Sequence, residues 1–175
     1  MKFIRIFLLI LIIIGVILLI TQKMWVPSLV TWILKTEHAD TDTGKIYKNV
    51  EYGFEIDFPD SWKGFSVVKN SWEGQKIDST ITQEKYTGPL LVFENPQTNS
   101  EHAWQNIPIM VFTADIWKLI IEEKIAVSAA PIAPAKIGEN SKYVFATPPR
   151  WYGFTDAEGW QEAVDIVKTF KTLDK

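Results

Sequence analysis

The chain has 175 residues, of which 47% are hydrophobic and 22% charged, with a formal net charge of −3 and no cysteine. This length accommodates one domain of ordinary size and an additional segment. The lack of cysteine excludes a disulfide framework, a thiolate zinc site and a cysteine nucleophile. The mild acidity, with only two arginines, argues against nucleic acid as a partner.

Charge is unevenly distributed along the chain. Residues 1–35 carry four basic residues and no acidic one, so residues 36–175 have a formal charge of −7. Most of residues 1–35 are also apolar. We therefore expect an apolar, basic N-terminal segment over 1–35, a short polar tether over 36–44 and one domain over 45–175. That domain is long enough to form a hydrophobic core of its own.

Residues 3–20 form an apolar stretch that only Arg5 and Gly15 interrupt. As a helix, this stretch would be roughly 27 Å long, close to the thickness of a hydrocarbon core. No A-x-A-like cleavage step follows it, so we expect a retained signal anchor in the lipid bilayer, with a cleaved signal peptide as the main alternative. Lys2 and Arg5 precede the stretch, which predicts a cytoplasmic N-terminus and a domain outside the cytoplasmic membrane.

A second apolar stretch, residues 24–34, contains Trp25 and Trp32. Tryptophan favours the interface between membrane and water, so this stretch fits an amphipathic segment on the outer leaflet. It fits equally well as a continuation of the anchor helix with a bend near Pro27.

Alternating and apolar runs predict several strands in the domain. Phe54, Ile56 and Phe58 alternate with acidic residues, which is typical of a half-buried strand. Turns are expected over 60–64 and 70–74, where small and polar residues gather. Further strands are expected over 65–69, 77–86, 90–93, 107–112 and 143–145.

Two amphipathic helices are expected among these strands. The first spans 114–124, with Thr113 as its N-cap. The second spans 156–171, begins with a capping box over 155–158, and places five residues on its inner face: Trp160, Ala163, Val164, Val167 and Phe170. Strands with one helix between them and one at the end predict an α+β domain, in which helices cover an antiparallel sheet.

The segment 47–62 resembles the opening of a PsbP-like domain. It has an aromatic residue, then Tyr52-Gly53-Phe54, an alternating strand, Pro59 and Trp62. The resemblance implies an α/β/α sandwich around an antiparallel sheet. It also implies a tethered or extrinsic membrane-side protein, as in bacterial members, that binds other proteins without established catalysis. From the residues themselves, these are core features that specify a fold rather than a reaction.

Few residues point to catalytic chemistry. Glu101 and His102 could contribute to a metal site, but no second histidine lies at a ligand-like spacing, so we expect a solvated loop and no metal or other cofactor. Glu122 and Glu123 are adjacent and would point apart on a helix. Residues 129–135 are expected to be a stiff surface connector.

The segment 148–154 is the most distinctive cluster. Arg150, the only arginine of the domain, lies beside Trp151 and Tyr152 in a loop bounded by proline and glycine. Arginine and tryptophan are favoured in binding hot spots, so we expect a binding surface formed by Arg150, Trp151, Tyr152 and Trp104. The alternative is that Trp151 and Phe154 pack under the last helix while Arg150 is exposed.

These observations favour a non-enzymatic, membrane-anchored, extracytoplasmic binding or accessory module with a protein partner. One alternative is a hydrolase or metal-dependent enzyme built from distant carboxylates, which converging acids and a raised carboxyl pKa would indicate. A second alternative is a sugar or cell-wall binding module, which requires Trp104, Trp151 and Tyr152 to face solvent.

Overall fold

The computed structural model describes residues 37–38, 46–128, 132–153 and 157–173, all within the unit Glu37–Lys175. The predicted anchor over 3–20 and the stretch over 24–34 lie outside the described residues. Among the described residues, no helix is long and apolar enough to cross a membrane.

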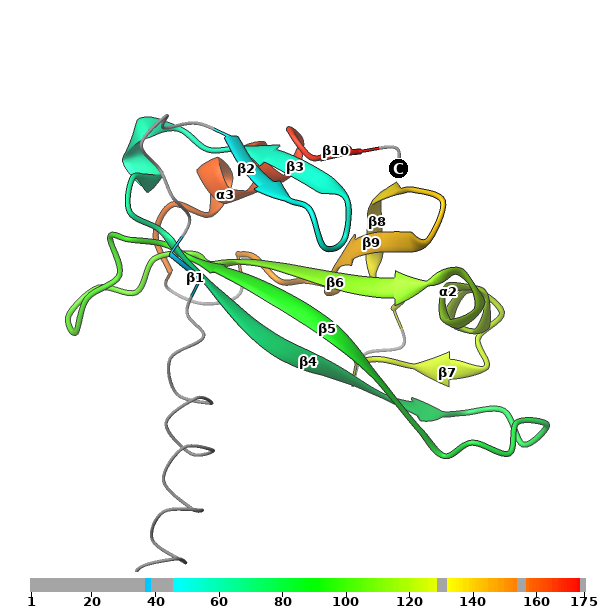
Figure 1. Cartoon of the computed structure of the whole chain (residues 1–175). Coiled ribbons are helices and arrows are strands. Elements are labelled where there is room, and N and C mark those ends of the chain that lie inside the picture. Colours follow the sequence, from blue (N-terminus) through cyan, green and yellow to red (C-terminus); the bar gives the residue numbers. More distant parts are fainter. Residues whose placement is uncertain (1–36, 39–45, 129–131, 154–156, 174–175) are drawn as a thin grey trace, which may run out of the picture. The chain divides into compact units, whose positions relative to one another are not determined.

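The domain is mostly β, with two antiparallel sheets and two short α-helices (Figure 1). The main sheet has the strand order β1-β4-β5-β6-β9-β8, with β7 paired to β4, and the small sheet has the order β10-β3-β2. The bounds of the main-sheet strands are β1 Glu37–His38, β4 Ser66–Lys76, β5 Lys85–Glu94, β6 Ile107–Thr113, β7 Ile125–Ala126, β8 Ala135–Glu139 and β9 Tyr143–Thr147. The remaining elements are β2 Ile46–Asn49, β3 Phe54–Asp57, the 3-10 helix η1 Asp60–Trp62, α2 Ala114–Ile121, α3 Trp160–Val167 and β10 Lys171–Thr172.

The two faces of the main sheet bury different core clusters, because side chains alternate along each strand. On β6, Ile109 and Val111 belong to one cluster while Met110 and Phe112 belong to the other. The larger cluster lies between the main sheet, the small sheet and α3, and we call it the large core. The smaller one, which we call the small core, lies between the main sheet and α2.

The antiparallel sheet with helices confirms the coarse fold prediction, although the helical layers are only partly present. Most of the cover on the large core comes from the small sheet, and α3 supplies Ala163 and Ile166. On the other face, α2 contributes Ile120 as its one fully buried residue. The strands predicted around 54–58, 90–93, 107–112 and 143–145 are confirmed, as are α2 and its cap, where the Thr113 hydroxyl accepts from Ile116 N.

The strand predicted over 65–69 is confirmed as the first part of β4, but the turn and the strand predicted after it were wrong. The turn expected over 70–74 is the second half of β4, paired to β5 from Asn70–Leu90 to Gly74–Tyr86. Gly74 serves close packing here, because a Cβ at this position would lie 2.9 Å from Val127 Cγ1. The strand expected over 77–86 is mostly the loop between β4 and β5, and only Lys85 and Tyr86 belong to β5.

Both helices are shorter than predicted. The first ends at Ile121 rather than at 124, and Glu123 has a positive φ of 55°. The second begins at Trp160 after Gly159, which has a φ of 73° and makes no side-chain cap, and it ends at Val167. The predicted capping box is wrong, because the Glu158 backbone bonds to Ala103 and Gln105 instead of starting a helix. The pairing of β1 also places Glu37 and His38 in a strand, within the segment predicted as a tether.

Candidate functional site: an aromatic strip

The four aromatic residues of the candidate site come from three separate segments. Trp104 lies in the loop between β5 and β6, and Trp151 and Tyr152 follow β9. Trp160, which the sequence placed on the inner face of the last helix, begins α3 and contacts Tyr152 instead. We call these four residues the aromatic strip.

The loop that carries Trp104, residues 95–106, is held by its own polar side chains. Asn106 Oδ1 accepts a hydrogen bond from Asn95 N at 2.8 Å, which ties together the two ends of the loop. Asn99 Oδ1 accepts from both Glu101 N and His102 N at 2.9 Å, and Thr98 Oγ1 accepts from Trp104 N at 3.2 Å. Asparagine favours such turns because its side chain bonds to nearby backbone. The loop therefore presents Trp104 in a fixed position.

Trp104 is fastened to the segment before α3. It pairs with Glu158 in a parallel bridge, in which Glu158 N donates to Ala103 O at 3.0 Å and Gln105 N donates to Glu158 O at 2.9 Å. The indole lies against the next residue, since a Cβ on Gly159 would come within 2.7 Å of its Cε3 atom. Glycine is required at 159 both for this approach and for its positive φ. The contact therefore fixes the position of Trp160, the first residue of α3.

The exposed part of the strip is formed by Tyr152 and Trp160. Their rings are nearly parallel, with an interplanar angle of 15° and centroids 5.8 Å apart, and they are 39% and 37% exposed. Trp151 meets Tyr152 edge-on at 5.2 Å and is half-buried against the large core. Of the three residues that the sugar-binding alternative requires at the surface, only Tyr152 is exposed, whereas Trp104 and Trp151 are half-buried. The Gln105 side chain donates to Trp151 O at 3.0 Å, which joins this segment to the loop that carries Trp104.

Arg150 lies at the margin of the strip with a strained backbone. Its φ of 54° is in the left-handed region, which costs a non-glycine residue about 1 kcal/mol or more. Arg150 is exposed, so its residue type does not arise from core packing. Such strain is concentrated at functional positions. The structure thus brings three predicted residues, Trp104, Trp151 and Tyr152, into one connected surface, with Arg150 next to it in the chain.

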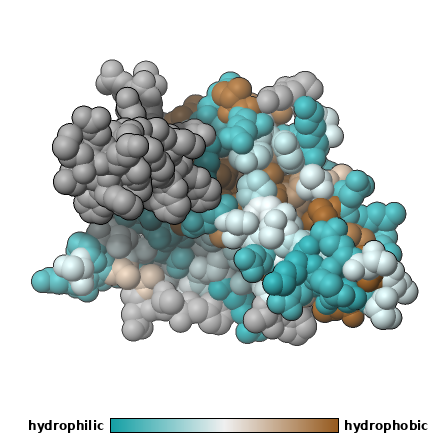
Figure 2. Space-filling model, turned by 60° about the horizontal axis from the view of Figure 1, so that its bottom comes forward, coloured by the Kyte–Doolittle hydropathy of each residue, from teal (hydrophilic) through white to brown (hydrophobic). Residues whose placement is uncertain are grey.

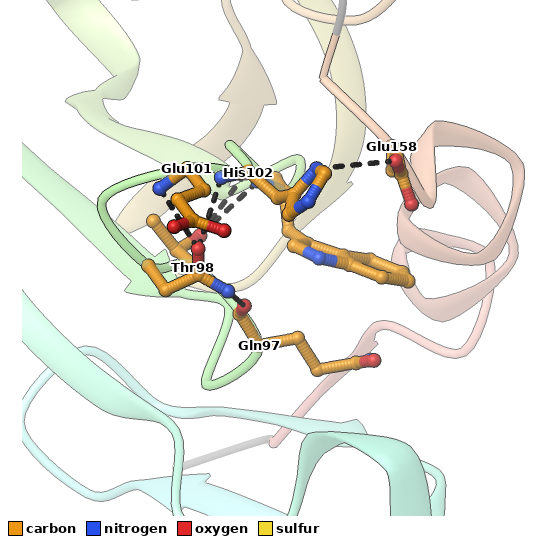
Figure 3. A network of polar contacts seen from close by, with 7 residues as sticks. Gln97, Thr98, Glu101, His102 and Glu158 are labelled. Atoms are coloured by element: carbon orange, nitrogen blue, oxygen red, sulfur yellow. Dashed lines mark hydrogen bonds and ion pairs between the residues drawn. The ribbon is translucent and has the colours of Figure 1, made fainter.

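Polar groups accompany the strip. His102 Nδ1 lies 3.8 Å from Glu158 Oε1, and both side chains are more than half exposed (Figure 3). Figure 3 shows His102 from the loop and Glu158 from the segment before α3 turned toward each other. Within the described residues, no group of three or more His, Asp or Glu side chains could hold a metal ion. Because both side chains are exposed, His102 and Glu158 can contribute hydrogen bonds and charge to a ligand at the surface.

Two exposed carboxyl groups outside the strip have lowered pKa values. Hydrogen bonds from Thr80 lower the pKa of Asp78, and a hydrogen bond from Lys124 lowers that of Glu122. A general acid would instead need a raised pKa. Glu122 forms ion pairs with Lys124 and Lys118, at 2.7 and 3.7 Å, so it belongs to a surface charge network.

A shallow hollow on another part of the domain is lined by Glu51, Tyr52 and residues 140–143. Its volume of about 40 Å³ is that of a few water molecules, far below the several hundred Å³ of a typical ligand site. Burial, with a further contribution from Glu51, raises the pKa of Tyr52 to about 12. Asn140 Nδ2 donates to the Tyr52 and Gly53 carbonyl oxygens at 2.9 and 3.1 Å, so the residues here hold the chain in place.

Among the residues that the structure describes, the exposed aliphatic side chains are scattered. On the face in Figure 2, hydrophobic residues occur in small separate groups among hydrophilic ones. Ile46, Val50, Ile77, Ile121 and Ile132 are exposed, but they come from separate turns, loops and element ends. Single exposed apolar residues of this kind are normal on protein surfaces.

Comparisons with known proteins identify no relative. No family model, no curated protein and no solved structure matches this chain.

Proposed function

We propose that this chain is a single-pass, membrane-anchored protein whose PsbP-like domain acts outside the cytoplasm as a non-catalytic binding or accessory module. The observation that carries the binding role is the aromatic strip, in which Tyr152 and Trp160 are exposed on rigidly held segments. Core aromatic residues are normally covered, so an ordered exposed pair calls for a ligand or partner.

The PsbP-like fold is supported by how the opening segment packs. Gly53 has a φ of 77° in the turn between β2 and β3. Phe54 and Ile56 are fully buried, and Trp62 at the end of η1 is buried with them in the large core. The motif thus contributes to the core, as the resemblance implies, and the main sheet is antiparallel, although the small sheet rather than a layer of helices covers most of the large core.

Membrane anchoring is supported by the sequence alone. The apolar stretch over 3–20 matches the length of a bilayer span. Lys2 and Arg5 lie at its start, which favours a cytoplasmic N-terminus under the positive-inside rule. In this arrangement the domain and its aromatic strip would lie outside the cytoplasmic membrane, where they can meet an external partner.

The absence of cysteine provides a direct test of this topology. Ser79 is exposed, and Ser79→Cys is nearly isosteric, so it introduces one thiol in the domain. We expect a membrane-impermeant maleimide to label this variant in intact cells, and to label Lys2→Cys only after permeabilisation. The chain should remain in the membrane fraction after alkaline washing. Labelling of Ser79→Cys only after permeabilisation would overturn the proposed location, and release of a shortened chain would indicate cleavage. Lysine-directed crosslinking in the native membrane would then identify a protein partner.

A further inference from the structure

We infer that the aromatic strip is a carbohydrate-binding surface, with Tyr152 and Trp160 as the platform on which a sugar ring stacks. This inference deepens the proposed function by naming a ligand class for the strip. Its direct evidence is the geometry of the rings and of the polar groups beside them.

The two exposed rings lie with their planes nearly parallel, at 15° to each other. Their centroids are 5.8 Å apart, whereas fully overlapped rings would lie only about 3.5–4 Å apart, so the two faces overlap only in part. The uncovered face of an aromatic ring is apolar and carries partial negative charge. A pyranose ring has a face of C–H bonds with slight positive charge, which complements an aromatic face.

The platform is preorganised, which lowers the entropic cost of binding a ligand. Trp151 packs edge-on against Tyr152 and is anchored on the large core. Trp160 begins α3 directly after Gly159, whose backbone is fixed by the Trp104 indole. A weak ligand such as a sugar benefits from rings whose positions are set before it binds.

The exposed area of Tyr152 and Trp160 alone is much smaller than a stable protein interface. Aromatic side chains present about 150–250 Å² each, so rings 39% and 37% exposed together offer on the order of 150 Å². A stable protein interface needs about 800 Å² from each partner. One or two sugar units match the smaller area, and the polar surroundings of the strip match the hydroxyl groups at the edge of a sugar.

The groups near the strip combine one carboxylate with one guanidinium, that of Arg150 beside Trp151, and this mixture suits a hydroxyl-rich ligand better than a nucleic acid. Stacking platforms for single-stranded nucleic acids lie in basic grooves that bind phosphates. Here the exposed carboxylate of Glu158 lies two residues before Trp160, beside His102. A carboxylate accepts strong, charge-assisted hydrogen bonds from sugar hydroxyls. The same carboxylate repels a phosphate group.

The test is calorimetric titration of the purified full chain in detergent with cellohexaose and with chitohexaose, two neutral β-linked glycans. We expect saturable, weak binding of at least one of them. Trp160→Ala and Tyr152→Ala should each weaken binding about tenfold, which corresponds to the loss of one stacked ring. Tyr152→Phe keeps the ring and should retain most of the affinity.

Ile121→Ala is the matched control, because Ile121 is an exposed apolar residue on α2, away from the strip. This variant should bind like the wild type, and thermal unfolding should show that every variant is folded. No binding of either glycan at millimolar concentration would overturn the inference. The inference would also be overturned if a folded Tyr152→Ala/Trp160→Ala double variant bound the glycans as tightly as the wild type. A crosslink between position 152 and a protein partner that persists in the presence of the glycans would overturn it as well. The titration does not depend on topology, so its failure is distinguishable from failure of the proposed location.

Discussion

The two faces of the main sheet are covered in different ways. The large core is closed by a second sheet and α3, and it contains Phe54, Phe58, Trp62 and Phe93 in mutual ring contacts or close packing. The small core is closed by α2 and is organised around Trp72, which contacts Phe112 at 4.8 Å. The first face is stabilised by many aromatic contacts, whereas the second has fewer, among them those of Phe112 with Trp72 and Trp117.

The two buried tryptophans use their indole N–H groups differently. Trp62 Nε1 donates to Glu162 Oε2 at 3.2 Å, and Glu162 also accepts from the Ser61 hydroxyl. This carboxylate fastens η1 to α3. Trp72 Nε1 donates to the Val111 carbonyl at 2.9 Å, one residue beyond the last β5–β6 pair, Leu90–Met110. The Trp62 N–H therefore bonds to a side chain near the surface, whereas the Trp72 N–H bonds to a buried backbone carbonyl.

The largest expected effect comes from removing a ring from the large core. Trp62 is fully buried, so Trp62→Ala should lower the free energy of unfolding by about 3–5 kcal/mol, through lost burial and the cavity left behind. Trp160→Ala is the matched control, because this ring is 37% exposed and should change stability by only about 0.5 kcal/mol. Denaturant unfolding of the full chain in detergent measures both. Equal losses would contradict the assignment of Trp160 to the surface.

The next largest effect on stability comes from removing the indole N–H of Trp72 or of Trp62, which lie on opposite faces of the main sheet. Trp72→Phe and Trp62→Phe remove a similar volume, but only the first leaves a buried backbone carbonyl, that of Val111, without its hydrogen bond. We expect Trp72→Phe to cost about 1–3 kcal/mol more than Trp62→Phe. Unfolding curves of the two variants, collected under the same conditions, give the difference. A larger loss for Trp62→Phe would show that the Glu162 bond matters more than the buried one.

The strand β3 and the second half of β4 show which parts of the fold could be predicted from the sequence and which could not. The strand at Phe54 and Ile56 was predictable, because its alternation reports burial on one face. The second half of β4 was not, because Asn70, Ser71 and Gly74 have turn-like residue types. Their strand conformation depends on pairing with β5 and on the approach of Val127, contacts that local sequence does not encode.

The candidate site was predictable to a similar extent. Arg150, Trp151 and Tyr152 were found by their unusual grouping in one loop. Trp160 was missed because its spacing to Ala163 and Val167 fits an inner helix face, yet it is the first residue of α3 and lies outside the core. The helix start is set by the bridge between Trp104 and Glu158, a contact between residues 54 positions apart. The one local signal that could have indicated the surface position of Trp160 is that it directly follows a glycine at the start of a helix.

A smaller effect is expected at the helix that covers the small core. The Thr113 hydroxyl accepts from Ile116 N at 3.4 Å at the start of α2. Thr113→Ala should lower the free energy of unfolding by about 1 kcal/mol, since the cap bond is lost. Thr113→Ser keeps the hydroxyl and is expected to lie close to wild type. Hydrogen exchange should show faster exchange in α2 for the alanine variant, while α3 is unchanged. Equal acceleration in α3 would mean that the two faces are not independent.

The smallest effect is a pH dependence at Tyr52, whose ring meets that of Tyr143 at the edge of the large core. Burial, and secondarily Glu51, raises its pKa from 10.0 to about 12, so the folded state favours the neutral phenol. The resulting stability is fully present below pH 10 and is lost as the pH rises through 12. Because the phenol is substantially solvated, the change should be modest. Ultraviolet titration of tyrosinate, as the difference between wild type and Tyr52→Phe, should place this ionisation near pH 12. A difference step near pH 10 would show that burial at this edge does not disfavour the phenolate.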